Sequence, residues 1–179
     1  MIKALILRIT RVLATPWRWA KQRKYADPQA ETAVRKEFQN DRFLPLVRQY
    51  IQQGETAIIF VKGYSMRPFL EHLRDRVKLA PWTELHVGDA ILAEIAPGHF
   101  VLHRIIDIQG NHITLMGDGN IRGTEHCTTA DVCGVVTEYL RPAGHVLLAS
   151  DPALCRRIRL WRRLLPIRRF LLFLYKATI

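Results

Sequence analysis

Three short stretches of this 179-residue chain concentrate side chains that can act as nucleophiles, acids or bases. They are Gly63-Tyr64-Ser65-Met66-Arg67-Pro68, Val101-Leu102-His103-Arg104 and Gly117-Asp118-Gly119-Asn120. A serine, a histidine and an aspartate supply the nucleophile, the base and the group that orients the base in one kind of hydrolytic site. Geometry and not chain order defines such sites. The residues therefore predict a Ser-His-Asp site if the fold brings them together.

The region that must position these stretches has the hydrophobic pattern of short strands. Segments rich in Val, Ile, Leu and Thr are separated by Gly, Pro, Asn and Asp, and Gln109-Gly110-Asn111 is typical of a hairpin turn. The predicted strands are 57–62, 76–80, 90–95, 100–108, 112–116 and 132–140. Six strands at this spacing indicate a small, mainly β domain over residues 55–145.

Helices are predicted on both sides of this domain, so the fold class is α+β overall. Apolar residues recur at helical spacing over 29–53 within an N-terminal extension of 1–54, and Pro45 is expected to start a second helix that Gly54 ends. A C-terminal amphipathic helix is predicted over 150–179. Asp151 is its expected N-cap, Pro152 its first residue, and Pro166 should kink or break it.

The net charge of +11 is unevenly distributed along the chain. Residues 1–25 carry +7 and residues 154–179 carry +8, with no acidic residue in either, so the remaining middle carries −4. Residues 1–24 also show apolar side chains at helical spacing. Three interpretations of the basic tails stay open: packing on the body, attachment to an anionic membrane surface, and binding of nucleic acid.

Cysteine usage and hydropathy bear on the compartment. The three cysteines, Cys127, Cys133 and Cys155, form no C-x-x-C pair and have no histidine partner at zinc-finger spacing, so neither a disulfide framework nor a structural zinc site is expected. No stretch is long and apolar enough for a secretory signal or a membrane-spanning helix. We expect a cytoplasmic protein, peripheral on the inner membrane face if its tails bind lipid, with no metal and no organic cofactor.

The ordered combination GYSMRPFL, VGDAILAEI, FVLHRIID and LMGDGN resembles the catalytic domain shared by signal peptidases and LexA-type self-cleaving repressors. The resemblance covers about residues 56–140. It implies a signal-peptidase/LexA-like β fold with Ser65 as the nucleophile. The position that holds lysine in the bacterial enzymes is His103 here, which is similar to the endoplasmic-reticulum and archaeal type of signal peptidase. A histidine base can accept the serine proton at neutral pH without strong desolvation.

A carboxylate is expected to hold the imidazole of His103 in the productive tautomer. Asp118 is the matching candidate in the GDGN stretch, and Glu125 in GTEHC is a second one. Signal peptidases commonly carry a hydroxyl residue two positions before the nucleophile, where this chain has Gly63. The oxyanion would then rest mainly on backbone N–H groups at Ser65 and its neighbour. The candidate substrate-binding or oxyanion residues are Gly63, Tyr64, Met66 and Pro68.

The sequence therefore predicts a serine endopeptidase that cleaves a peptide or leader segment bound as an extended strand. Two alternatives belong to other classes: a non-catalytic peptide-binding module on the same fold, and a basic nucleic-acid-associated protein. Without catalysis, Ser65 would cap a turn, His103 would be a half-buried strand residue and Asp118 a turn former.

Overall fold

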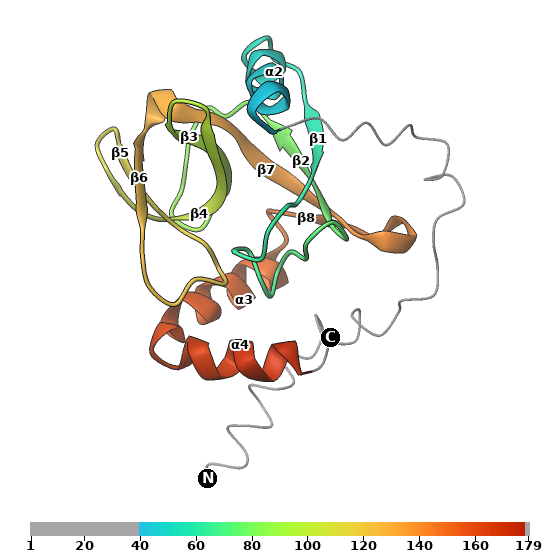
Figure 1. Cartoon of the computed structure of the whole chain (residues 1–179), viewed down its shortest axis with the longest axis vertical. Helices are drawn as coiled ribbons and strands as arrows, with labels where there is room; N and C mark the ends of the chain where they lie inside the picture. The colour runs from blue at the N-terminus through green and yellow to red at the C-terminus, as the bar shows by residue number, and fades with distance from the viewer. Residues whose placement is uncertain (1–39, 178–179) are drawn as a thin grey trace.

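A computed structural model describes residues 40–177 of the chain (Figure 1). The predictions for residues 1–39, which include the basic amphipathic stretch at the N-terminus, lie outside the described residues. The α-helices of the described residues are α2 (Asn40–Gln52), α3 (Pro152–Arg163) and α4 (Arg168–Lys176), and η4 (Leu165–Ile167) is the short 3₁₀ turn between the last two. Two further 3₁₀ turns are η2 (Thr129–Asp131) and η3 (Pro142–Gly144).

One antiparallel sheet of eight strands forms the body of the molecule. The strands are β1 (Ala57–Phe60), β2 (Arg76–Ala80), β3 (Ala90–Ala96), β4 (His99–Gln109), β5 (His112–Met116), β6 (Glu125–Thr128), β7 (Val132–Leu140) and β8 (Val146–Leu148). Their order is β1-β2-β7-β3-β4-β5-β6, and β8 pairs with the C-terminal half of β7. The predicted α+β class is therefore confirmed, although the particular peptidase fold is a separate question.

All six predicted strands are present, and three have the predicted bounds. Strands β6 and β8 were not predicted, because β6 has the polar sequence Glu-His-Cys-Thr and β8 is only three residues long. The prediction for Pro45 was wrong: α2 begins at Asn40 and contains Pro45 in its interior. Gly54 follows the helix end with φ +90°, a conformation that glycine adopts without a steric penalty.

The sheet separates two hydrophobic clusters because successive side chains of a strand point to opposite faces. The larger cluster joins α2, through Val47 and Ile51, to α3, through Leu154 and Trp161. The smaller one covers the other face of β3, β4 and β5, and its buried members are Ile91, Ala93, Ile105, Ile113, Leu115, Cys127 and Val132. Consecutive residues of β4 thus face different surroundings, which decides the layout of the candidate site.

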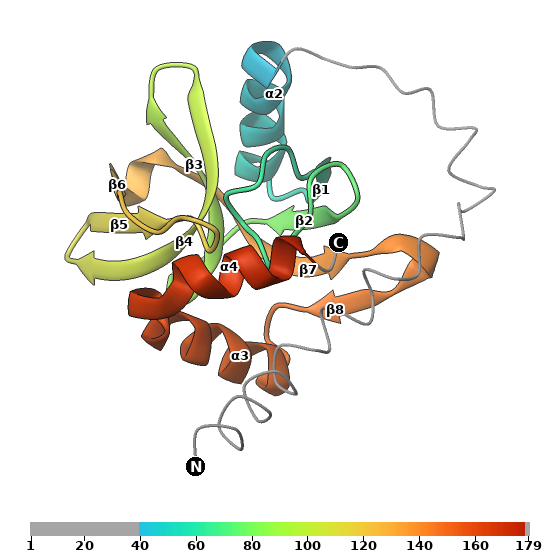
Figure 2. The same cartoon turned by 60° about the horizontal axis from the view of Figure 1, so that its bottom comes forward.

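The basic C-terminal segment packs on the body (Figure 2). Asp151 caps α3 by accepting a hydrogen bond from the Leu154 N–H, Pro152 is the first helical residue, and the helix breaks around Pro166, all as predicted. Trp161 of α3 and Leu171 of α4 are buried in the larger cluster. Within residues 40–177, no helix combines the length and the apolar character needed to cross a bilayer.

Candidate active site

Ser65 lies in the loop between β1 and β2, and the residues that follow it anchor this loop in the core. The Arg67 N–H donates to the Tyr64 carbonyl and the Leu70 N–H to the Met66 carbonyl, which closes a helical turn behind Ser65. The side chains of Met66 and Leu70 are buried in the larger cluster. These buried side chains anchor the loop, while Ser65 itself stays partly exposed.

Two glycines allow the loop after β5 to lie directly against the Ser65 loop. A Cβ on Gly117 would come within 2.5 Å of the Ser65 carbonyl oxygen and 3.0 Å of the Ser65 Cβ. A Cβ on Gly119 would come within 2.6 Å of the Tyr64 carbonyl oxygen. The Gly119 N–H donates a 2.6 Å hydrogen bond to the Ser65 carbonyl. The GDGN stretch thus requires glycine on both sides of Asp118, because backbone meets backbone there.

His103 lies on β4, and the neighbouring strand β5 leads into the loop that contacts Ser65. The register of β4 and β5 ends with the pair Arg104–Met116, and Gly117 is the first residue after β5. A Cβ on Gly117 would point at Ser65. The Ser65 loop therefore packs against the residue that follows β5, and β5 pairs with the strand that carries His103.

Glu125 is the carboxylate that contacts His103. Its Oε2 lies 2.9 Å from Nδ1 of the imidazole, across β5 from the first residue of β6. The His103 side chain is only 7% exposed, whereas that of Glu125 is 27% exposed. A Nδ1–H that donates to Glu125 leaves Nε2 as the proton acceptor. A pair of this geometry can supply a base and the acid that orients it.

Asp118 does not contact His103, contrary to one of the two sequence-based expectations. Its carboxylate accepts hydrogen bonds from Nε of Arg104 at 2.8 Å, and both side chains are almost fully buried. The physical reason is strand alternation, which sends the side chains of His103 and Arg104 to opposite faces of β4. Burial opposes the charge on Arg104, but Asp118 and Tyr139 outweigh that penalty, so the pKa of Arg104 is raised.

Arg104 ties several segments of the site together. Its Nη1 donates to the Gly88 carbonyl at 2.7 Å, and its guanidinium lies 5.5 Å from the centroid of the Phe69 ring. From the other side, the Trp161 indole N–H donates to the Asp118 carbonyl at 2.8 Å. Arg168 donates to the Asn120 carbonyl at 2.9 Å. The loop after β5 is thus fixed by a buried ion pair and by two residues of the C-terminal segment.

The backbone around Ser65 offers hydrogen-bond donors for an oxyanion. Neither the Ser65 N–H nor the Met66 N–H donates a hydrogen bond to any part of the chain that the structure describes. Gly63 has φ +92°, a conformation that strains a residue with a side chain, so a hydroxyl residue would be disfavoured at this position. The side chains of Met66 and Pro68 are buried, so of these two residues only Met66 offers a free polar group to a substrate, its backbone N–H.

A shallow groove of about 320 Å³ adjoins the Ser65 loop. Tyr64, Gly119 and Ile121 line one side of it, and α4 lines the other through Leu172 and Phe173. Its basic members are Arg67, Arg169 and Lys176. Arg67 lies 4.1 Å from the centroid of the Tyr64 ring and is paired with Glu71. The groove therefore presents apolar surface next to positive charge.

Sequence reasoning missed Arg104, the close approach at Gly117 and Gly119, and the supporting roles of Trp161 and Arg168. The signal for Arg104 was available, since a histidine and an arginine side by side on a strand must face opposite sides. Cys127 and Cys133 are poor nucleophiles, because burial raises the pKa of both thiols to about 11. Among the described residues, no group of His, Cys, Asp and Glu is placed to hold a metal ion.

Comparisons with known proteins give no relative: no family model, no curated protein and no solved structure matches this chain.

Proposed function

We propose that this protein is a serine endopeptidase with a Ser65–His103–Glu125 site on a signal-peptidase/LexA-like fold. The observation that carries the proposal is the His103–Glu125 pair, 2.9 Å apart, on the strand whose neighbour β5 ends against the Ser65 loop. A largely buried imidazole held by a carboxylate is the base that a partly exposed serine nucleophile needs for acyl transfer.

In the proposed reaction, Nε2 of His103 accepts the Ser65 hydroxyl proton as Oγ attacks the substrate carbonyl carbon. Glu125 accepts a hydrogen bond from Nδ1–H and stabilises the imidazolium that forms. The N–H groups of Ser65 and Met66 donate to the oxyanion. The imidazolium then protonates the leaving amine, the C–N bond breaks, and an acyl-serine remains. Water, deprotonated by His103, hydrolyses this ester and restores the Ser65 hydroxyl.

The groove beside Tyr64 is the proposed binding place for the peptide or leader segment. Its apolar lining from Ile121 and Phe173 suits hydrophobic side chains, and Arg169 and Lys176 suit an acidic residue nearby. We also propose a cytoplasmic location with peripheral attachment to the inner membrane face. The support is the exposure of Phe170 and Phe173, at 61% and 68%, on a helix whose charged residues are all basic.

Labelling by a fluorophosphonate probe tests the proposal directly, because the chain has only two serines, Ser65 and Ser150. The wild-type protein and Ser150→Ala should be labelled on Ser65, and Ser65→Ala should not. Cleavage of a denatured protein library, read by mass spectrometry, should show the same pattern. A library cleaved equally by Ser65→Ala would rule out Ser65 as the nucleophile.

The second candidate is a non-catalytic peptide-binding module. The observation in its favour is that Ser65 Oγ and His103 make no hydrogen bond to each other in the described part of the chain. Catalytic hydrogen bonds are often long in unliganded sites and tighten when substrate binds. This candidate would be favoured if the wild-type protein binds peptides but is not labelled by the probe and cleaves no substrate.

A further inference from the structure

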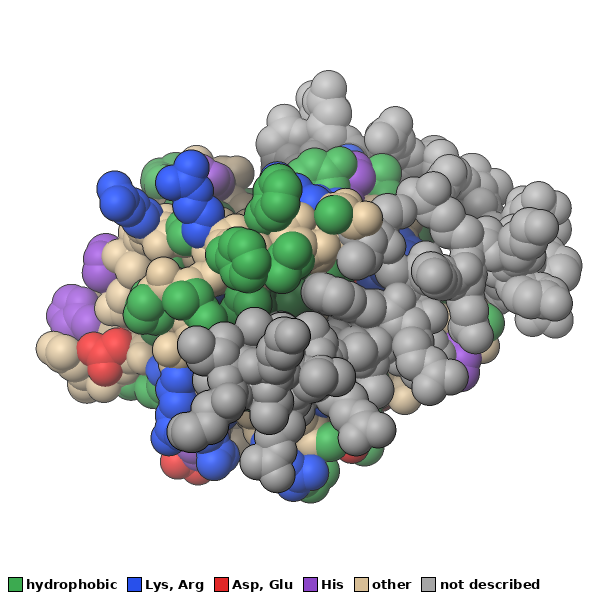
Figure 3. Space-filling model, turned by 90° about the horizontal axis from the view of Figure 1, so that it is seen from below, with side chains coloured by type: hydrophobic (Ala, Val, Ile, Leu, Met, Phe, Trp, Pro, Cys, Tyr) green, Lys and Arg blue, Asp and Glu red, His purple; other side chains and the backbone are tan. Residues whose placement is uncertain are grey.

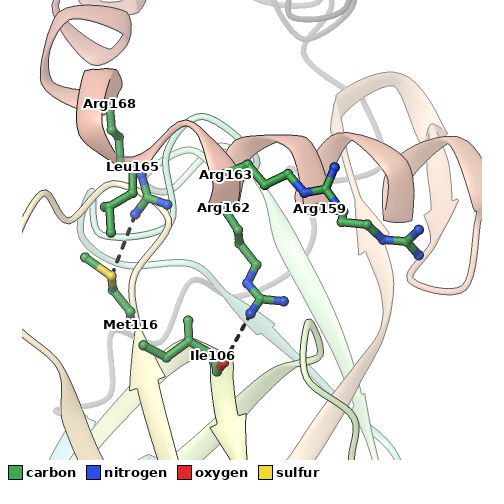
Figure 4. A pocket seen from close by; sticks show the side chains of 7 residues that line it. All are labelled: Ile106, Met116, Arg159, Arg162, Arg163, Leu165 and Arg168. Carbon is green, nitrogen blue, oxygen red and sulfur yellow. Dashed lines mark hydrogen bonds between the residues drawn. The ribbon is translucent and has the colours of Figure 1, made fainter.

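A second pocket lies between the C-terminal helices and the strands β4 and β5, on the Asp118 side of the sheet (Figure 4). Its volume is about 360 Å³. Four arginines line it, together with apolar side chains from Ile106, Met116 and Leu165; the arginines are Arg159, Arg162, Arg163 and Arg168. No acidic side chain lines the pocket, and residues 152–179 include none. The pocket therefore combines a strong positive charge with an apolar wall.

The positive charge of this pocket is not neutralised within the described chain. Asp118 is the carboxylate that attracts Arg162 and Arg168, and it is hydrogen-bonded to Arg104. Arg162 and Arg168 donate to backbone carbonyls, at 3.1 Å to Ile106 and 2.9 Å to Asn120. Carbonyl oxygens satisfy donors without cancelling charge. Arg159 and Arg163 make no hydrogen bond or ion pair with any described residue.

Two properties show that the arrangement is costly without a counter-ion. Arg168 is 3% exposed, and its Nε has no hydrogen-bond partner among the described residues. The pKa values of Arg162 and Arg168 are lowered, first by burial and also by the positive charge of Arg104, and the opposing attraction of Asp118 does not cancel this lowering. A buried cation that lacks an anionic partner destabilises the fold. An anion in the pocket would remove this penalty.

We propose that this pocket binds a phosphate-class anion, either a free phosphate ester or the headgroup of an anionic phospholipid. Guanidinium groups donate pairs of N–H bonds to phosphate oxygens, and several arginines can share one phosphate. Figure 4 shows Arg162 pointing from α3 toward β4, and Arg168 pointing toward Met116 from the start of α4. The apolar wall suits the carbon skeleton of an ester.

The surroundings of the pocket fit both sources of the phosphate group. Leu165, Ile167 and Phe170 are exposed on η4 and α4 beside it and could enter the interfacial region of a bilayer. Figure 3, which views the molecule from below, shows hydrophobic side chains gathered next to Lys and Arg side chains. A soluble phosphate ester needs only the arginines. The experiment has to separate these sources.

The test compares two double variants of the full chain that remove the same charge from the same helix. Arg159→Gln/Arg163→Gln changes the pocket, and Arg156→Gln/Arg157→Gln changes α3 outside it. None of the four arginines makes a hydrogen bond or an ion pair with a described residue, so neither variant removes one from the fold. Circular dichroism and thermal unfolding establish that both variants fold. Isothermal titration calorimetry then measures glycerol phosphate and pyrophosphate, and flotation measures phosphatidylcholine vesicles with and without phosphatidic acid.

The expected result is at least about tenfold weaker binding for the pocket variant and an unchanged affinity for the control variant. Binding of the soluble phosphates assigns a free ester, and binding only to phosphatidic acid vesicles assigns a headgroup. No binding by the wild-type protein in any arm overturns the proposal. An equal loss in both variants, or equally tight binding of duplex DNA by both, indicates diffuse charge attraction and overturns it too. None of these measurements depends on cleavage at Ser65.

Discussion

Each face of strand β4 carries a basic side chain paired with a carboxylate, and the two pairs differ in burial and in the chemistry of the basic group. His103 meets Glu125 on one face, where the carboxylate stays partly exposed. Arg104 meets Asp118 on the other face, where both side chains are almost fully enclosed. A histidine can gain and lose a proton near neutral pH, whereas a buried arginine beside a carboxylate keeps its charge. We infer that the first pair performs chemistry and that the second holds the loop on which the chemistry depends.

The largest expected effect comes from His103→Ala, which removes the proposed base. Loss of the base should reduce turnover by about 10⁴-fold, or roughly 5 kcal/mol of transition-state stabilisation, with the fold retained. Cleavage rates of any substrate found in the library screen measure it. His126→Ala is the matched control, because His126 is exposed on β6, which is separated from β4 by β5. Similar losses in both variants would contradict the assignment of His103 as the base.

Asp118→Asn should break the structural pair and lower the free energy of unfolding by about 3–5 kcal/mol, since Arg104 is left buried without a counter-charge. Urea unfolding measures the loss. Asp107→Asn, on an exposed part of β4, should change stability by less than about 0.5 kcal/mol. The double variant Arg104→Met/Asp118→Leu should recover much of the loss. If Asp118→Asn stops cleavage but unfolds like the wild type, Asp118 acts in catalysis instead.

Glu125→Gln should reduce turnover by about 10²-fold, less than the loss of the base, because the amide can still contact the imidazole. The free energy of unfolding should change by under about 1 kcal/mol, since Glu125 is partly exposed. Glu84→Gln serves as the control, because Glu84 is exposed and distant from Glu125 in the sequence. Measured together, Glu125→Gln and Asp118→Asn should show opposite profiles, one affecting rate and the other stability.

The smallest effect is expected from thiol reagents. Cys127 belongs to the hydrophobic cluster on the His103 face, and burial raises its pKa to about 11, so little thiolate exists at pH 8. Iodoacetamide at pH 8 should modify Cys155, which is partly exposed, before Cys127 and should leave cleavage unchanged. Rapid loss of cleavage together with alkylation of Cys127 would contradict Ser65 as the nucleophile.

Sequence patterns were sufficient for most of the sheet but not for its contacts. Apolar alternation and turn residues located six strands, whereas β6, with the polar sequence Glu-His-Cys-Thr, gave no such signal. The choice between Asp118 and Glu125 required the register of β4, β5 and β6, and no local pattern encodes that register. Trp161 and Arg168 could not be connected with the Asp118 loop, because their contacts are made across tertiary packing alone.

The bond from the Trp161 indole to the Asp118 carbonyl also has a consequence for the timing of folding. It joins residues 43 positions apart, and the residue that supplies the support is the later one in the chain. A ribosome therefore delivers Ser65, His103, Glu125 and the Asp118 loop before it delivers the helix that braces this loop. The emerging sheet holds every proposed catalytic group while still lacking the brace. Competence for cleavage should consequently arise only after α3 has left the exit tunnel.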